Sequence, residues 1–299
     1  MQTVTKMQAY LTQPGYEIRE RRGPFIRYFN KTPKGIICPH FWHIAWANGC
    51  PYHCSYCYLQ GTFRGRVNPV VYINFHDLLE EVDGWLSMEP PQMLNTGELT
   101  DSLAITDRVM VKLILRFARQ KKHKLLLLTK SDNVGNLLGL AHNNQTVVSF
   151  SINAPEVAEQ YEAGAPCVES RLEALARVAE AGYEVRVRVD PMIPIKGWAA
   201  AYRELAKRLT CLPISRVTLG TIRYFPIAAE YAAKLGRNLE VFGLAEERTA
   251  DRRLRLRENL RIDMYRNIFN YFRCPVALCK ETTSVFTALN PSAKCNCIM

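Results

Sequence analysis

Short apolar runs alternate along this chain with longer stretches whose apolar residues recur every three or four positions. Residues 124–129 contain four consecutive leucines, which is typical of a strand buried on both faces. Residues 166–181 carry leucine, valine and alanine at helical spacing and are followed by Gly182. This pattern predicts strands at 43–48, 92–95, 124–129, 146–152, 184–189 and 216–220. It predicts helices at 76–86, 102–120, 134–142, 166–181, 198–209 and 260–272.

The order of these segments gives about six strand-then-helix units, which argues for a parallel sheet, either open or curled into a barrel. We therefore expect an α/β fold over residues 43–235; its closure as a partial (β/α)6 barrel of the TIM type is what the family resemblance given below implies. A basic N-terminal extension would occupy residues 1–42. A C-terminal extension, with an arginine-rich segment and a cysteine-rich tail, would occupy residues 236–299, and all three parts would form one structural domain.

Composition changes this picture in two ways. The 299 residues are 48% hydrophobic and 22% charged, which excludes a disordered or fibrous chain. Residues 1–22 lack a secretory signal and no run of 18 apolar residues exists, so we expect a cytoplasmic protein, monomeric and without a membrane partner. The net charge of +11 favours a polyanionic partner, DNA before a membrane surface, over a merely solvated basic surface.

Cysteine usage is the first chemical signal. The chain has ten cysteines, and in a reducing compartment thiols serve metals and catalysis more often than disulfides. Cys50, Cys54 and Cys57 lie in a C-x3-C-x2-C spacing just after the first predicted strand. Thiolates select soft metals, and three of them leave a fourth coordination position open for a substrate. The alternatives are a zinc site completed by His43 or His53 and three buried structural thiols.

This cysteine motif, with the aromatic Tyr56 before its third cysteine, resembles that of the radical S-adenosylmethionine (SAM) superfamily. The resemblance implies that Cys50, Cys54 and Cys57 hold a [4Fe–4S] cluster whose fourth iron chelates SAM. Reductive cleavage of SAM would release a 5′-deoxyadenosyl radical, and the electron would come from a donor such as flavodoxin or ferredoxin. SAM would lie across the carboxyl ends of the strands, as ligands do in α/β barrels.

Polar residues follow the second, third and fourth predicted strands, where that resemblance places SAM. Residues 95–98 read Asn-Thr-Gly-Glu, and Glu98 would accept the methionyl amino group. Lys130 and Ser151 would contact the carboxylate and the ribose. The full set of implied cofactor-binding residues is Tyr56, Asn95, Gly97, Glu98, Lys130, Ser149, Ser151, Asn153 and Arg188.

A closer resemblance covers residues 36–286. Segments 49–60, 128–133 and 278–282, supported by 149–153, 161–166 and 189–193, look like those of the spore photoproduct lyase family. In that family the adenosyl radical abstracts hydrogen from a thymine dimer in DNA, which then fragments to two thymines. The resemblance implies that Tyr56 and Tyr58 help to return the hydrogen atom. The alternative is that Tyr56 only packs on the cluster and that Tyr58 is a core residue.

Two departures separate the chain from the sporulation enzyme. Asn95, which has no S–H hydrogen, stands where the family has a cysteine hydrogen donor, and the DNA-gripping hairpin is not recognisable. We therefore expect a lyase-like DNA repair enzyme acting on a pyrimidine lesion. The alternatives are a radical SAM enzyme for a small molecule or peptide, and a non-catalytic metal-containing protein that binds nucleic acid.

The tail contains Cys274, Cys279, Cys295 and Cys297, for which three interpretations remain open. They are inert thiols, ligands of a second metal site, or a tail that brings a thiol to the barrel mouth. Because Asn95 cannot donate a hydrogen atom and an S–H bond can, we predict that Cys279, Cys295 or Cys297 lies near the open side of the cluster and is catalytic.

Two basic segments, 116–124 and 246–266, are candidates for contacts with DNA phosphates. The second also contains acidic residues, which is typical of a solvated helix face. If it binds phosphate, reversing several charges among Arg252, Arg253, Arg255 and Arg257 should flatten the salt dependence of DNA binding.

Overall fold

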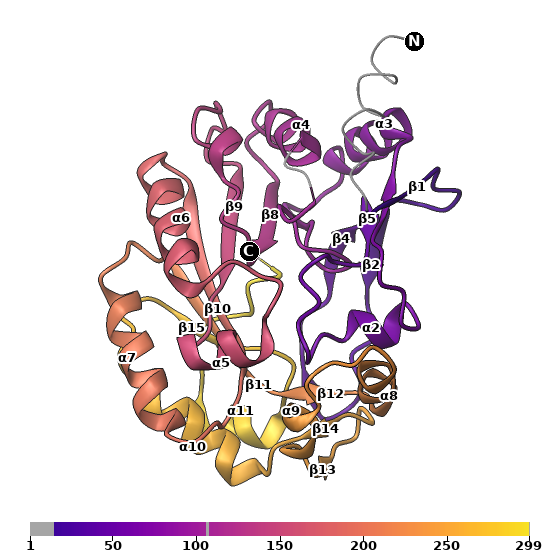
Figure 1. The fold of residues 1–299 in the computed structure, drawn as a ribbon. Helices are drawn as coiled ribbons and strands as arrows, with labels where there is room; N and C mark the ends of the chain where they lie inside the picture. Colours follow the sequence, from indigo (N-terminus) through magenta and orange to yellow (C-terminus); the bar gives the residue numbers. More distant parts are fainter. Residues whose placement is uncertain (1–14, 106–107, 299) are drawn as a thin grey trace.

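The computed structural model describes residues 15–105 and 108–298 and has an α/β architecture (Figure 1). Within these residues the main sheet has eight strands in the order β15-β11-β10-β9-β8-β7-β4-β2. All of its neighbours pair in parallel except β2, which is antiparallel to β4. The strands are β2 (Ile26–Phe29), β4 (Phe41–Ile44), β7 (Met93–Asn95), β8 (Lys124–Thr129), β9 (Thr146–Ser151), β10 (Glu184–Met192), β11 (Arg216–Thr221) and β15 (Val276–Leu278).

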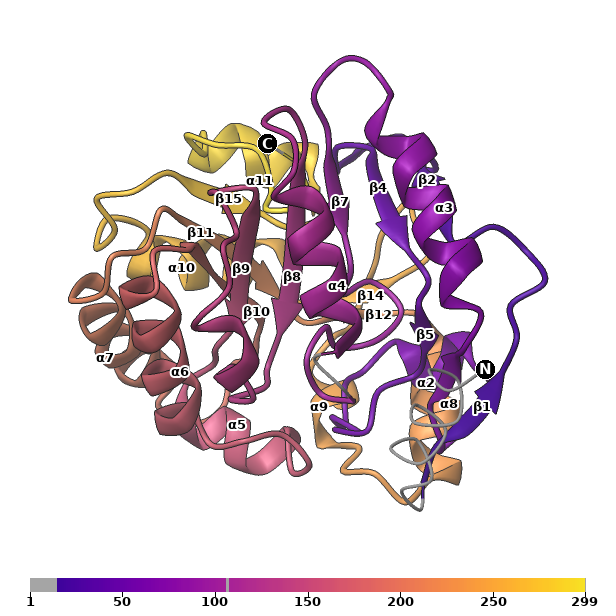
Figure 2. The ribbon, with the colours of Figure 1, turned by 90° about the horizontal axis from the view of Figure 1, so that it is seen from above.

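Helices cover one face of this sheet. Figure 2 shows α3, α4, α6 and α7 along that face, with the C-terminal segment on the other side of the strands. Their inner residues, such as Leu113 and Leu175, are fully buried in the main core. The described helices are α2 (Leu59–Thr62), α3 (Phe75–Leu86), α4 (Arg108–Phe117), α5 (Pro155–Tyr161), α6 (Val168–Glu180), α7 (Trp198–Thr210), α8 (Pro226–Lys234), α9 (Glu240–Gly243), α10 (Glu258–Phe269) and α11 (Thr283–Leu289).

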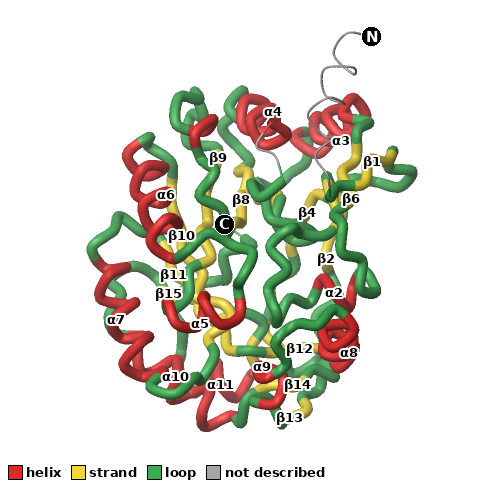
Figure 3. The backbone as a smooth tube through the Cα atoms, in the orientation of Figure 1, coloured by secondary structure: helices red, strands yellow, loops and turns green. Residues whose placement is uncertain are grey.

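Smaller sheets tie the extensions to this core (Figure 3). They are β1-β6-β5, β12-β14-β13 and β16-β3. Their strands are β1 (Glu17–Arg19), β3 (Ile36–Ile37), β5 (Ala47–Asn48), β6 (Val70–Tyr72), β12 (Arg223–Tyr224), β13 (Glu247–Arg248), β14 (Leu254–Arg255) and β16 (Glu281–Thr282). Because β2 and β15 also join the main sheet, residues before 43 and after 235 contribute to the same unit, which supports a single structural domain.

The predicted α/β fold is confirmed, with local differences. The segment 43–48 divides into the end of β4 and the separate strand β5. The expected helix at 134–142 is only one 3-10 turn, Gly135–Leu137, because Gly135 and Gly139 disfavour a continuous helix. The helix expected at 102–120 is α4, and its positions 106–107 lie outside the described residues. Among the described residues, no helix is long and apolar enough to cross a membrane.

The two faces of the central strands differ, because successive side chains point to opposite sides. Leu127 and Phe150 pack into the main core under the helices. Leu126 and Val147 form a separate apolar cluster on the opposite face. Ser149 shares that second face with Val147, and it accepts a hydrogen bond of 3.1 Å from Asn296. The C-terminal tail therefore lies against the side of the sheet that the helices leave free.

Candidate functional site

The cysteine loop lies between β5 and α2 and is held by close backbone packing. Gly49 has a φ of +87°, a conformation that other residues rarely adopt. Gly164 packs directly on the loop, since a Cβ there would stand 2.3 Å from the Tyr52 carbonyl oxygen. The Ser55 amide also donates to the Tyr161 carbonyl at 2.8 Å. The turn after α5 therefore fixes the path of the loop that carries the three cysteines.

Burial dominates the electrostatics of these three thiols. Desolvation raises the pKa of Cys50 well above its ordinary value and the pKa of Cys54 to about 12. The pKa of Cys57 is also raised by burial. Cys54 and Cys57 add to the rise at Cys50, which shows that the three sulfurs lie close enough to repel one another as thiolates. A bound metal removes this cost, because it replaces the protons and stabilises the thiolate form.

The three cysteine ligands of the loop have the chemistry that fits a metal cluster. Cys50, Cys54 and Cys57 supply three soft ligands from eight consecutive residues, the chemistry that iron–sulfur clusters require. Among the described residues, no three or more Cys, His, Asp or Glu side chains form a group that could already hold a metal ion. This applies to His43 and His53, so the zinc alternative has no closed ligand set. The same finding holds for the thiols of Cys50, Cys54 and Cys57.

Lys130 belongs to a buried network beside the cysteine loop. The Tyr56 hydroxyl donates to Glu162, whose carboxylate also pairs with Arg171. Lys130 Nζ lies 3.9 Å from Glu162 Oε1 and donates to Ser151 Oγ at 2.8 Å. Although burial opposes ionisation, Lys130 and Arg171 hold the pKa of Glu162 below its ordinary value. The structure thus brings Tyr56, Lys130 and Ser151 together.

Glu98 lies in the turn that follows β7. Gly97 is required there, because a Cβ would stand 2.5 Å from the Leu128 Cβ atom. Asn95 shapes the turn by accepting the Gly97 amide at 2.8 Å. The Glu98 carboxylate lies 3.8 Å from Lys280 Nζ, and its carbonyl accepts the Tyr58 hydroxyl. Tyr58 therefore contacts Glu98 in the turn at the carboxyl end of β7.

Three residues of this region were missed by the sequence analysis. Asp101 accepts hydrogen bonds from Thr129 Oγ1 and from the Lys130 amide, both at 2.6 Å, and so joins the second and third strand ends. Glu162 and Arg171 form the buried pair beside Tyr56. No local signal distinguishes them from surface residues, because charged side chains are buried only through partners that are distant in sequence.

Other predicted cofactor contacts are engaged within the protein. Asn153 is buried, donates to the Pro191 carbonyl at 2.8 Å and accepts the Tyr202 hydroxyl at 3.0 Å. Ser149 accepts from Asn296, as described above. Arg188 donates to Cys279 at 2.8 Å and to Cys297 at 3.5 Å. Ser149 and Arg188 thus contact the C-terminal tail.

The tail cysteines divide into a cluster and an outlier. Cys279, Cys295 and Cys297 are buried, Arg188 donates to Cys279 and Cys297, and Cys295 packs with Cys297. Cys274 is only partly buried and is not among their partners. Because no group able to hold a metal ion is found in the described residues, the structure does not support a second metal site at these four cysteines. Lys280, the neighbour of Cys279 in the chain, has its Nζ atom 3.8 Å from the Glu98 carboxylate, so the segment after β15 reaches the turn after β7.

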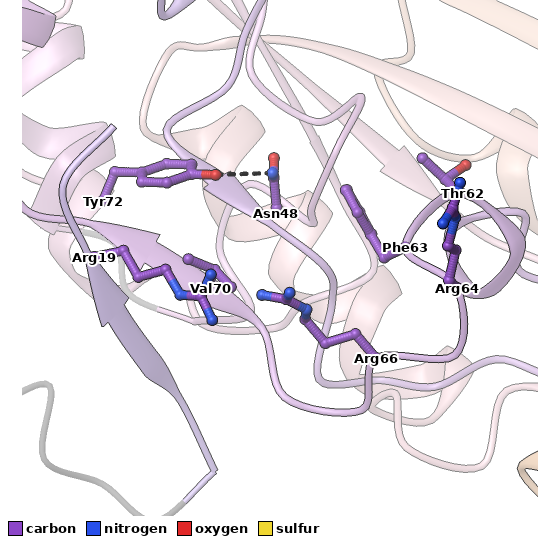
Figure 4. Close-up of a pocket in the computed structure, with 8 residues that line it drawn as sticks. All are labelled: Arg19, Asn48, Thr62, Phe63, Arg64, Arg66, Val70 and Tyr72. Carbon is purple, nitrogen blue, oxygen red and sulfur yellow. Dashed lines mark hydrogen bonds between the residues drawn. The ribbon is translucent and has the colours of Figure 1, made fainter. Parts of the chain in front are cut away.

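A basic pocket of about 250 Å³ lies next to the cysteine loop (Figure 4). Arg19, Arg64 and Arg66 supply its charge, and Asn48 in its wall stands two residues before Cys50. Its lining residues are Arg19, Asn48, Thr62, Phe63, Arg64, Arg66, Val70 and Tyr72. Glu17 is the acidic neighbour, 2.5 Å from Arg19 and 3.5 Å from Arg66. Arg19 and Arg66 share one carboxylate, and Arg64 adds a third guanidinium group to the lining, so the pocket keeps a positive charge that suits a phosphate.

The arginine-rich segment does not form such a surface. Arg255 is fully buried and pairs with Asp251 at 2.7 Å. Arg253 pairs with the same carboxylate at 2.6 Å and lies over the Phe225 ring. The expectation that Arg252, Arg253, Arg255 and Arg257 act together on phosphates is therefore wrong, because the central residue of the run is in the core. The segment 116–124 is also largely paired, through Arg116 to Asp83, Lys122 to Glu89 and Lys124 to Glu184.

Comparison with known proteins gives a consistent result. A family model described as spore photoproduct lyase matches residues 40–224. The chain is 32% identical to the spore photoproduct lyase of Bacillus subtilis (strain 168) over 170 residues, 56% of this chain and 50% of that protein. It is 30% identical to that of Geobacillus sp. (strain Y412MC61) over 186 residues, 60% of this chain and 54% of that protein. The chain thus spans about half the length of the curated relatives it matches.

Solved structures match a larger share of this chain than the curated relatives do. A spore photoproduct lyase complexed with dinucleoside spore photoproduct superposes with a TM-score of 0.72 at 24% identity, covering 87% of this chain and 80% of that one. A mutant spore photoproduct lyase with bound AdoMet and dinucleoside spore photoproduct gives a TM-score of 0.71 at 24% identity, covering 89% and 82%. These similarities establish the fold as the partial barrel of that enzyme.

Proposed function

The chain belongs to the spore photoproduct lyase family, and from this premise we propose that it is a radical SAM lyase acting on a thymine photoproduct in DNA. The observation that carries the proposal is the meeting of the cysteine loop with Glu98, Lys130 and Ser151 at the carboxyl ends of neighbouring strands. A solved relative contains bound AdoMet and the dinucleoside spore photoproduct, which supports the same ligands here. The test is anaerobic turnover with SAM and a defined photoproduct, for which we expect 5′-deoxyadenosine and repaired thymine.

Cys50, Cys54 and Cys57 would hold a [4Fe–4S] cluster and leave one iron for SAM. When bound, the cluster and SAM together supply a 5′-deoxyadenosyl radical. The residues of the chain would bind and orient SAM. Glu98 would accept a hydrogen bond from the methionyl ammonium group. Lys130, fixed by Glu162 and Ser151, would donate to the carboxylate.

Hydrogen return is the step for which this chain needs its own solution. Asn95 is buried and has no S–H bond, so the thiol must come from elsewhere. We propose the tail cysteines Cys279, Cys295 and Cys297, of which Cys279 precedes Lys280, whose Nζ atom lies 3.8 Å from the Glu98 carboxylate. Tyr58 is 44% exposed and would relay the hydrogen atom between this thiol and the cofactor side.

Two substitutions test the SAM contacts. Glu98→Ala and Lys130→Ala are expected to weaken SAM binding while iron content stays unchanged, because each removes one charge-assisted hydrogen bond. Such a bond is worth about 1.5–3 kcal/mol, or roughly ten- to over a hundredfold in affinity. Equilibrium binding of SAM to the reconstituted protein measures this. Lys124→Ala, a change at the opposite end of β8, is the matched control, and unchanged affinity in both test variants would remove these residues from the site.

The basic pocket gives a prediction for DNA. We expect weak, sequence-indifferent binding whose affinity falls with salt at a log–log slope near −0.9 per phosphate contacted. Arg64→Glu combined with Arg66→Glu should reduce the magnitude of that slope by about 1 to 2. The matched control is Arg257→Glu with Arg266→Glu, which makes the same change in net charge at exposed positions of the arginine-rich segment. Equal losses in the two variants would show that only the overall charge matters.

The second candidate function keeps the radical chemistry and replaces DNA by a small molecule or peptide. Its supporting observation is Asn95, which departs from the donor position of the family. An electron donor such as flavodoxin or ferredoxin serves both functions equally.

A further inference from the structure

Three buried sulfur atoms meet on the face of the sheet opposite the helices. Cys279 directly follows β15, whereas Cys295 and Cys297 lie in the tail, at least sixteen residues later. Arg188 donates to the sulfur atoms of Cys279 and Cys297, at 2.8 and 3.5 Å, and Cys295 packs with Cys297. All three side chains are less than a tenth exposed. The cluster therefore brings the sulfur atoms of two distant segments together.

The charges around Cys279 require an anion. Arg188 Nη2 lies 2.8 Å and Arg223 Nη2 lies 3.0 Å from its sulfur. Asp190 accepts from the same two guanidinium groups, at 3.2 Å from Arg188 and at 2.8 and 3.0 Å from Arg223. Two buried cations face one carboxylate, which leaves one positive charge unbalanced at a high desolvation cost. A Cys279 thiolate balances it.

The acidity of the thiols follows this arrangement. The hydrogen bond from Cys295, together with Arg188 and Arg223, lowers the pKa of Cys279 to about 6 against the effect of burial. The hydrogen bonds that Cys295 makes to Cys279 and Cys297 raise its own pKa well above the ordinary value. Burial raises the pKa of the neighbouring Cys38 to about 12. Cys279 is thus the nucleophile of the group and Cys295 its protonated partner.

Backbone and side-chain anchors hold the tail in this position. Asn296, between the two tail cysteines, donates to Ser149 Oγ at 3.1 Å and to the Val187 carbonyl at 3.3 Å. Arg216 donates to the Ile298 carbonyl at 3.3 Å. Phe41 packs against Cys295 and Cys297 from the other side. In Figure 2 the yellow C-terminal segment accordingly lies on the side of the strands away from α6 and α7.

We propose that Cys279 and Cys295 form a redox-active pair that converts between a dithiol and a disulfide by exchange with small disulfides. The Cys279 thiolate attacks one sulfur of the small disulfide and releases the first small thiolate. Cys295 then loses its proton, and its sulfur attacks the Cys279 sulfur of the mixed disulfide and releases the second small thiolate. One small disulfide is reduced to two thiols, and two protein thiols are oxidised to one disulfide.

The disulfide has two consequences for the barrel. It ties the tail covalently to Cys279, the residue that follows β15, beside Arg188 and Arg223. It also removes the negative charge beside Arg188 and Arg223, so that their pairing with Asp190 is left unbalanced. The oxidised protein would therefore have a fixed tail and one S–H bond fewer, that of Cys295, next to the site.

Disulfide mapping tests this inference without the cluster. The protein with Cys50, Cys54 and Cys57 replaced by alanine is equilibrated in buffers of 2-hydroxyethyl disulfide and 2-mercaptoethanol, alkylated and digested with trypsin. We expect one linked peptide pair, residues 274–280 with 295–299, which separates on reduction, while Cys167 and Cys211 are recovered as alkylated thiols at ratios that oxidise the pair.

Single-cysteine variants show which two cysteines form the disulfide. Cys279→Ser should abolish the linked pair, whereas Cys274→Ser, in the same tryptic peptide, should leave it intact. Cys295→Ala provides a second disruption on the other side, and circular dichroism checks that each variant is folded. No linked pair at any ratio, or a bond through Cys274, Cys38 or between Cys295 and Cys297, would overturn the proposal. Because this protein holds no cluster, such a failure says nothing against the proposed lyase function.

Discussion

Replacement of Cys50, Cys54 and Cys57 together by alanine is expected to abolish iron binding in the loop and all formation of 5′-deoxyadenosine from SAM. The three thiols are the only soft ligands within the loop between β5 and α2. Removing them leaves no thiolate to hold the cluster on which SAM cleavage depends. Iron analysis after anaerobic reconstitution should fall from about four irons per chain to none.

The matched control replaces Cys167 and Cys211 by alanine, two exposed cysteines on the outer helices. That variant should keep the iron content and the SAM cleavage rate of the unaltered protein. Iron bound in this loop together with SAM cleavage by the triple variant would refute the assignment of the cluster.

Replacement of Arg171 by alanine is expected to lower the free energy of unfolding by about 3–5 kcal/mol, because it leaves a buried carboxylate without its main partner. Arg171 is 1% exposed, pairs with Glu162 and donates to the Pro166 carbonyl at 2.8 Å. Lys130, 3.9 Å from Glu162, remains but cannot supply the lost hydrogen bonds. Urea denaturation of the cluster-free protein measures the change.

Arg208→Ala is the control for this stability prediction. Arg208 also pairs with a glutamate, Glu169, but that carboxylate is 58% exposed. Exposed pairs contribute about 0–1 kcal/mol, so the control should change stability little. Similar small losses in both variants would show that the network of Tyr56, Glu162 and Arg171 does not support the cysteine loop.

The sequence predicted the sheet best where one strand is buried on both faces. The leucine run at 124–129 coincides with β8 (Lys124–Thr129). β15 (Val276–Leu278) was missed because three residues are too few to establish a period. The predicted end of the strand at residue 189 was wrong, since β10 continues to Met192 through a register shift that the sequence does not reveal.

The sequence predicted those parts of the candidate site whose residues lie close together in the chain. The cysteine spacing and the Asn-Thr-Gly-Glu turn lie within single loops, and short-range patterns therefore revealed them. The buried charges could not be predicted in the same way. Arg261 pairs with Glu281, twenty residues later, and the sequence does not show which acid faces which base. The tail cysteines meet Arg188 from about a hundred residues away, so only the fold brings them together.

The most direct test of the account is one anaerobic reaction of the reduced, reconstituted protein with SAM and the dinucleoside spore photoproduct, followed by chromatography. The account predicts that 5′-deoxyadenosine is formed from SAM and that the photoproduct is converted to thymidine units. The absence of 5′-deoxyadenosine would contradict the radical SAM assignment. Formation of 5′-deoxyadenosine with the photoproduct left intact would contradict the proposed substrate and favour a small molecule or peptide.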